Sequence, residues 1–124
     1  MRNFRKYDIW LDGMDLVNAI YNLVENFPST EKFALSSQIT RSAVSVPSNI
    51  AEGASRSSEK DFARFLEIAL GSAFELETQL LIANKRRYIT IIEVNESINM
   101  LHSLQKRISA LRKKVLNKED IAKG

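Results

Sequence analysis

The chain of 124 residues contains no cysteine, which excludes disulfide bonds and thiolate metal sites. It also lacks any apolar run near the roughly 18 residues that a membrane-spanning helix needs. The basic residues 1–6 are not followed by the apolar core of a signal peptide, because Asp8 and Asp12 interrupt it. We therefore expect a cytoplasmic protein with no membrane partner.

Catalytic and cofactor-binding motifs are missing as well. The sequence shows no nucleotide-binding loop, no nucleophile–base pair and no redox motif. His102 is the single histidine, and Asn99 stands where a di-iron helix would carry the glutamate of its Glu-x-x-His pair. Glu75 and Glu77, two residues apart on a helix, point to different sides. We expect no catalytic residue, no metal site and no cofactor, and hence a protein that is not an enzyme.

Only two prolines and four glycines interrupt the chain, and its apolar residues recur with helical spacing and without strand alternation. The pattern predicts four helices at about residues 8–26, 29–53, 58–85 and 90–117. Helices of this length joined by short turns favour an antiparallel up-and-down four-helix bundle. The expectation is an all-α fold in which residues 1–124 form a single domain.

Hydroxyl side chains mark the starts of three of these helices. Ser29 or Thr30 can cap the second helix, and Ser58 can cap the third. Thr90 and Glu93 have the spacing of a capping box at the start of the fourth. We expect this fourth helix to end near residues 116–117, and residues 120–124 to be frayed.

Apolar stripes predict the interior of the bundle. The first helix carries a coiled-coil-like seam at 4, 3, 4, 3 spacing, and the third and fourth helices each carry one long stripe. The residues assigned to these stripes are Trp10, Met14, Val17, Tyr21 and Val24; Phe62, Phe65, Leu66, Ala69, Ala73, Leu76, Leu80 and Ala83; and Val94, Ile98, Leu101, Leu104, Ile108, Leu111 and Val115.

The third predicted helix is apolar on more than one side, because Ile68, Leu70, Phe74 and Leu81 extend beyond its main stripe. A helix that is apolar around much of its surface must bury more than one face. A four-helix monomer covers one face, so the second predicts contact with another subunit. We therefore expect a homo-oligomer.

Residues 38–53 place a proline and several polar residues inside a helical pattern. Pro47 removes a backbone donor, at a cost of about 3 kcal/mol in an isolated helix, so we expect a bend there. Serine hydroxyls in the stretch are expected to satisfy freed carbonyls. Gly53 is expected to end the helix in the left-handed conformation. The apolar stripes of this helix are assigned to Phe33, Ala34, Ala43, Val44, Val46, Ile50 and Ala51.

The same stretch begins a candidate site near the turn between the second and third helices. Its polar cluster consists of Arg41, Asn49, Glu52, Arg56 and Lys60. One interpretation is a hydrogen-bonded set inside the bundle, with Glu75 or Thr78 as partners of Arg41. The other is a ligand site, in which the last four cluster residues converge and the N-terminus of the third helix receives an anion.

Charge is distributed unevenly around a net charge of +3, with the excess of cations toward the C-terminal part. A basic region can attract phosphate backbones, although a solvated surface is the alternative interpretation. Binding of RNA or DNA there would be weakly sequence-specific and sensitive to salt. The candidate nucleic-acid-binding residues are Lys85, Arg86, Arg87, Lys106, Arg107, Lys113 and Lys114.

Several of these motifs together resemble a known family. The runs at residues 38–53, 60–62, 65–66 and 71–80 are similar to the four-helix-bundle proteins encoded in intervening sequences of bacterial 23S rRNA genes. The resemblance extends from about residue 4 to about residue 88 and covers the fourth helix only in kind. That family is similar in fold to the accessory variability determinant of diversity-generating retroelements, a pentameric barrel that binds reverse transcriptase and nucleic acid. The resemblance therefore implies a homopentamer with a basic surface.

The leading hypothesis is a non-enzymatic, self-associating four-helix bundle that serves as a scaffold or nucleic-acid-binding accessory protein. One alternative is a small-ligand binder or enzyme that uses the polar cluster at the turn between the second and third helices. Another is a protein-interaction module that docks through the fourth helix. The expected partners are further copies of the chain, RNA or DNA, or another protein.

Overall fold

Four long helices make up most of the computed structural model, which describes the backbone of residues 2–123 and the side chains of residues 2–118. The described chain contains no strand, so the all-α prediction is confirmed. The helices are α1 (Asp8–Val24), α2 (Leu35–Ala54), α3 (Glu59–Lys85) and α4 (Ile91–Lys123), with short 3-10 turns η1 (Phe4–Lys6) and η2 (Ser29–Glu31).

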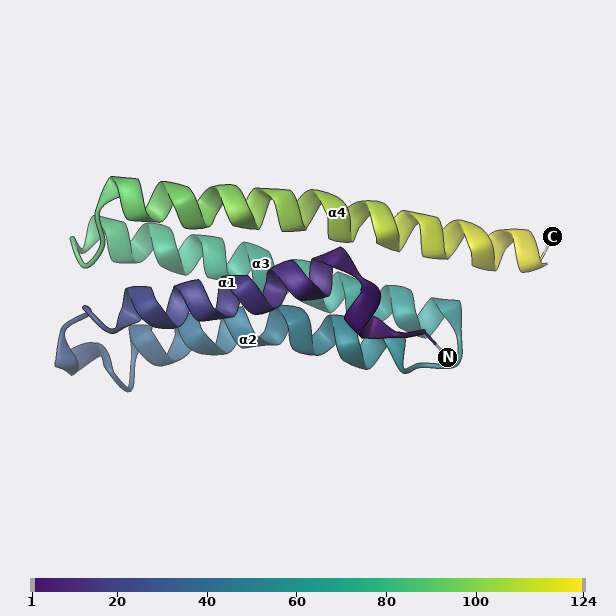
Figure 1. The fold of residues 1–124 in the computed structure, drawn as a ribbon, viewed down its shortest axis with the longest axis horizontal. Coiled ribbons are helices and arrows are strands. Elements are labelled where there is room, and N and C mark those ends of the chain that lie inside the picture. Colours follow the sequence, from purple (N-terminus) through teal and green to yellow (C-terminus); the bar gives the residue numbers. More distant parts are fainter. Residues whose placement is uncertain (1, 124) are drawn as a thin grey trace.

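Successive helices run in opposite directions, as the ribbon in Figure 1 shows. α1 packs against α2 and α4, and α3 packs against the same two helices. Each helix therefore has two neighbours, as in an up-and-down four-helix bundle. The α2–α3 turn and the N-terminal segment lie at one end of the bundle, and the α1–α2 and α3–α4 connections lie at the other.

Two of the predicted helix starts are confirmed. The Ser58 hydroxyl accepts a hydrogen bond from the Asp61 backbone N–H at 3.0 Å and caps α3. The Glu93 N–H donates to the Thr90 hydroxyl at 3.2 Å, while the Glu93 carboxylate accepts from the Thr90 N–H at 3.1 Å. This reciprocal pair is the predicted capping box of α4.

The predicted start of the second helix is wrong. Ser29 to Glu31 form the separate turn η2, and α2 begins only at Leu35. The helical backbone conformation is interrupted at Ala34, where φ is −122° and ψ is −106°. The Leu35 N–H donates instead to the Glu31 carboxylate at 3.2 Å, so a glutamate takes the capping role expected of a hydroxyl.

α4 runs to Lys123 and does not end near residues 116–117 as predicted. Neither proline nor glycine occurs between residues 91 and 123, so nothing in the local sequence stops the helix. The fraying expected for residues 120–124 is therefore wrong for the backbone up to residue 123, and residue 124 lies outside the described chain.

The core follows the predicted stripes on α3 and α4 but not on α1. All eight residues assigned to the α3 stripe are buried, as are five of the seven on α4, where Ile98 and Leu111 are half-buried. On α1, Met14 and Tyr21 are exposed. The residues of α1 that point inward are Ile9, Gly13, Leu16 and Ile20.

The contact between Gly13 and Pro47 explains why α1 presents this other stripe. A Cβ added at Gly13 would lie 3.3 Å from the Pro47 Cβ, so the absence of a side chain lets the two helices approach closely. Both residues are buried. α2 continues through Pro47 as one helix, and the bend expected there stays a prediction.

Two further predictions for the second helix are wrong. Gly53 has no positive φ and lies inside α2, where a Cβ would come within 2.7 Å of the Phe65 Cβ. Its role is close packing against α3. Phe33, assigned to an apolar stripe, is 90% exposed because it precedes the helix.

Candidate functional site

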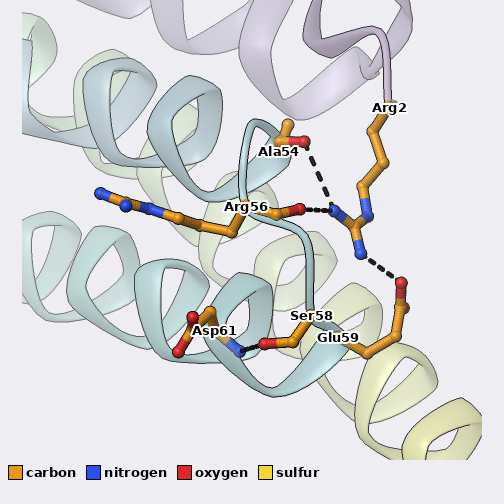
Figure 2. Close-up of polar contacts among 6 residues, drawn as sticks. All are labelled: Arg2, Ala54, Arg56, Ser58, Glu59 and Asp61. Carbon is orange, nitrogen blue, oxygen red and sulfur yellow. Dashed lines mark hydrogen bonds and ion pairs between the residues drawn. The ribbon is translucent and has the colours of Figure 1, made fainter.

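One arginine ties the N-terminal segment to the α2–α3 turn, as Figure 2 shows. Arg2 donates to the backbone carbonyls of Ala54 at 3.4 Å and Arg56 at 2.6 Å, and it pairs with the Glu59 carboxylate. Its guanidinium carbon lies 4.5 Å from the centre of the buried Phe62 ring. The charge of Arg2 is thus satisfied inside the molecule, where it holds the turn.

A cavity of about 520 Å³ opens at this turn and includes one residue of the predicted polar cluster, Arg56. Arg56 pairs with Glu52 at 2.8 Å and lies over the Phe65 ring. Lys60 is exposed and does not line the cavity. Of the four cluster residues predicted to converge at this turn, only Arg56 lines the cavity, so that predicted convergence is not observed.

A shallow groove of about 470 Å³ over the outer side of α2 brings together the other three cluster residues, Arg41, Asn49 and Glu52. The half-buried Asn49 amide donates to the backbone oxygen and the hydroxyl of Ser45, both at 2.8 Å. The Ser45 hydroxyl lies 2.7 Å from that of Ser72 on α3. Asn49 is therefore engaged in a polar network that links α2 to α3, as the structural interpretation predicted for this residue.

The same interpretation is wrong for Arg41, which is exposed, as are Glu75 and Thr78. At about 100° per residue, Arg41 lies nearly opposite the core-facing residues of α2 such as Ile39 and Ile50. It faces solvent and cannot reach across the bundle to the outer side of α3.

Large apolar side chains remain exposed along α3. We call Ile68, Phe74, Leu81 and Ile82 the α3 outer face, and each of them is at least 42% exposed. Leu70, also assigned to the second apolar side, is half-buried. The prediction that α3 has apolar surface left uncovered by its own bundle is confirmed.

A second apolar surface follows the predicted seam of α1. We call it the α1–α2 groove; its volume is about 420 Å³. Its lining comprises Phe4, Trp10, Met14, Val17, Val44, Pro47, Ser48 and Ala51. The heptad spacing read from α1 therefore describes a real stripe, but this stripe lies at the surface beside α2 and not in the core.

The seven predicted basic residues fall into two groups. On α4, Arg107 is already paired with Asp12 of α1 at 2.7 Å. The same helix also carries Lys106, Lys113 and Lys114, which are exposed. Lys113 lies more than 20 residues beyond the α3–α4 turn, which is about 35 Å along the helix. The two groups therefore do not form one compact basic patch.

Lys85, Arg86 and Arg87 form the other group, at the α3–α4 turn, and all three are exposed. None of them takes part in the salt bridges found among the described side chains. A hydrogen bond with Tyr88 is the main reason that the pKa of Arg86 is raised above its ordinary value. Like any arginine, Arg86 is charged at physiological pH.

His102 lies at the surface between α3 and α4. Its Nε2 is 3.3 Å from a Glu77 carboxylate oxygen that also accepts a hydrogen bond from Gln105 at 2.8 Å. Within the described residues, no three potential metal ligands gather in one place. Among the same residues, no helix has the length and apolarity to cross a membrane.

Sequence reasoning missed two residues, Arg2 and Phe33. The sequence did carry a signal for Phe33, because its neighbours three and four positions away are serine or threonine and offer no apolar stripe. Arg2 had no such signal, since its partners lie more than 50 residues along the chain.

Comparisons with known proteins agree with this architecture. The family described as 23S rRNA-intervening sequence protein has a sequence model that matches residues 5–110, further into α4 than the resemblance predicted. A crystal structure of a protein with unknown function from the S23 ribosomal protein family of Bacteroides thetaiotaomicron is 28% identical, with a TM-score of 0.77. That match covers 85% of this chain and 98% of the other. No curated protein matches the chain.

Proposed function

The chain belongs to the 23S rRNA-intervening sequence protein family, and from its surface we propose that it is a self-associating helical scaffold. The observation that carries the proposal is apolar surface exposed on two sides, at the α3 outer face and the α1–α2 groove. Removing apolar surface from water contributes about 25 cal/mol per Å², from which the entropic cost of association is subtracted. Large exposed apolar patches are typical of interaction sites.

Further copies of the chain are the proposed occupants because the two apolar surfaces differ. An isologous dimer would use one surface twice and leave the other uncovered. A head-to-tail contact uses one surface of each kind per subunit, and it closes into a ring when the rotation fits. The homopentamer implied by the resemblance is such a ring, and we propose it as the assembly.

Light scattering on the purified protein tests self-association. We expect a single oligomeric mass at low micromolar concentration, and Phe74→Glu should shift it to the monomer because a charge would have to be buried. The matched control is Ile92→Glu, since Ile92 is 72% exposed at the start of α4 and lies outside both surfaces. A monomeric wild-type protein, or equal effects of the two substitutions, would contradict the proposal.

We propose nucleic-acid binding as a second function, supported by the α3–α4 turn. There Arg87 has a φ of 66°, in the left-handed region that favours glycine. A non-glycine residue in this region costs roughly 1 kcal/mol. The turn thus carries a cation at a position where glycine would be more stable, beside the exposed Lys85 and Arg86.

Salt dependence tests this second function. Binding driven by phosphate contacts should weaken steeply between about 50 mM and about 200 mM salt. Fluorescence anisotropy of labelled RNA and DNA measures it, with the oligomeric mass recorded in parallel. If neither nucleic acid binds at the lower salt concentration, this function is wrong, whatever the state of assembly.

We propose no reaction for the chain. In the groove over α2, Asn49 is bonded to Ser45 and Glu52 is paired with Arg56, so both side chains have partners within the fold. The family and the similar crystal structure carry no named activity. A non-enzymatic scaffold is consistent with these observations.

A further inference from the structure

The end of the bundle opposite the α2–α3 turn combines exposed cations with an exposed aromatic ring. Phe33, just before α2, is 90% exposed, and the Lys32 ammonium lies 5.5 Å from the centre of its ring. The α3–α4 turn belongs to the same end of the bundle (Figure 1). We call Lys32, Phe33, Lys85, Arg86 and Arg87 the basic end.

Side-chain contacts hold the two connections of the basic end together. The rings of Phe27 and Tyr88, one from each connection, have their centres 5.5 Å apart. Phe27 is buried, so this contact is part of the packed structure. The pKa of Arg86, raised mainly by Tyr88, is raised further by Glu31 of η2, as expected if the two connections lie side by side. The two connections that carry the cations and the Phe33 ring are therefore in contact at this end of the bundle.

The cations of the basic end have no carboxylate partner among the salt bridges of the described side chains. Glu31 accepts a hydrogen bond from the Leu35 N–H and also raises the pKa of Arg86, but it forms no salt bridge with the cations.

We propose that the basic end binds single-stranded nucleic acid, with Phe33 as a stacking surface for a base and the cations as phosphate contacts. The inference rests on the nucleic-acid function proposed above and specifies its ligand. A ring can stack on a base only where the base is unstacked from its neighbours, as in a single strand. A duplex keeps its bases stacked and would meet the cations alone.

A groove lies next to Lys32, the residue that precedes Phe33. Its volume is about 340 Å³, and Tyr21, Pro28 and the acidic Glu25 also line it. Tyr21 is 48% exposed and offers a second ring for stacking. A strand that crosses the basic end could therefore place one base on Phe33 and a second near Tyr21, with Lys32 between them.

An anionic membrane surface would also attract these cations. The two ligands differ in what they require of Phe33, because stacking needs an aromatic ring whereas membrane insertion accepts any large apolar side chain. The Lys32–Phe33 contact and the aromatic lining of the adjoining groove favour nucleic acid.

Fluorescence anisotropy with a labelled oligo-uridine of about 20 nucleotides, and a labelled duplex of the same length, tests the proposal. We expect tighter binding of the single strand. Phe33→Leu should weaken that binding roughly 5- to 100-fold, the range measured for loss of one stacked base, and leave duplex binding unchanged. Phe33→Tyr keeps an aromatic ring and should bind the single strand as the wild-type protein does. Ile92→Ala is the matched control and should change neither, because it removes an exposed aliphatic side chain at the same end.

Charge variants identify the phosphate contacts. The double variant Lys85→Gln with Arg86→Gln should lower the slope of log affinity against log salt by about 1.4, at about 0.7 per contact on a single strand. The matched control, Lys113→Gln with Lys114→Gln, removes the same charge from the distant part of α4. It should leave the slope unchanged.

Each remaining outcome overturns a distinct claim. Single-strand binding that survives Phe33→Leu overturns the stacking surface, while the broader nucleic-acid function stands. Absence of binding to either oligonucleotide overturns both. The protein could instead sediment with phosphatidylserine vesicles and bind no oligonucleotide. If the Phe33→Leu variant also sediments with the vesicles, the basic end binds membranes and the proposal is overturned.

Discussion

The two ends of the bundle use the same residue types in opposite ways. At the α2–α3 end, Arg2 lies over Phe62 and Arg56 lies over Phe65, and both rings are buried. Both of these arginines are also paired with glutamates. At the basic end, Phe33 is almost fully exposed, and within residues 2–118 the cations form no salt bridge with a carboxylate.

The difference shows that an arginine or lysine beside a phenylalanine has no fixed role. A cation over a ring contributes about 0.5–1 kcal/mol at an exposed site, which is small next to a buried ring or a charged hydrogen bond. At the α2–α3 end the partners come from three segments of the chain and complete a structural contact. At the basic end, no such contact is formed among the side chains that the structure describes, and the same groups face solvent.

The largest expected difference between the ends concerns a glycine. Gly53→Ala should destabilise the protein by about 2 kcal/mol, because the new methyl group would lie 2.7 Å from the Phe65 Cβ and force α2 and α3 apart. Gly71→Ala is the control, since nothing lies within 4 Å of its added Cβ. It should stabilise α3 by up to about 1 kcal/mol. Urea unfolding midpoints measure both, and equal shifts would refute the tight packing at the α2–α3 end.

Removing the Arg2 side chain should have the next largest effect. Arg2→Ala loses two hydrogen bonds to carbonyls and a partly buried ion pair, so we expect about 1–2 kcal/mol of destabilisation. Lys85→Ala, at the other end, should stay within about 0.5 kcal/mol. Comparable losses in thermal unfolding would show that the two ends do not differ as described.

Arg87→Gly should act in the opposite direction. Relief of the left-handed conformation is expected to stabilise the protein by about 1 kcal/mol. The same variant should bind single-stranded RNA more weakly, because a phosphate contact is lost. Denaturant unfolding would then show a higher stability, while anisotropy would show a lower affinity for RNA. A variant that gained stability with unchanged affinity would remove Arg87 from the binding surface.

Phe33→Ala should have the smallest effect on stability, within about 0.5 kcal/mol, since the ring is almost fully exposed. Its melting temperature should match that of the wild-type protein. A marked drop would mean that Phe33 is covered in solution, most directly by another subunit, and would remove the contrast between the two ends.

Features that depend on neighbours along the chain could be predicted from the sequence. Ser58 and the Thr90–Glu93 pair cap α3 and α4 as expected, because a cap involves residues only three positions apart. The α3 stripe was equally clear, since its apolar residues recur over about six turns. The end of α4 was misplaced because a charged sequence was taken for a frayed one.

Features that depend on contacts between helices could not be predicted in the same way. α1 carries two stripes of similar spacing, and its sequence does not state which one faces inward. Of the candidate site, the sequence located Asn49 and the cations of the α3–α4 turn. It placed Arg41 in the interior, because spacing along α2 gives which residues share a face but not where that face points.

The two stripes of α1 are offset by a single position, so turning the helix through about 100° would exchange them. The contact between Gly13, which has no side chain, and the ring of Pro47 selects between these orientations. The proline of α2 thus acts on a neighbouring helix. By fixing the rotation of that helix, it determines which hydrophobic row is buried and which stays at the surface.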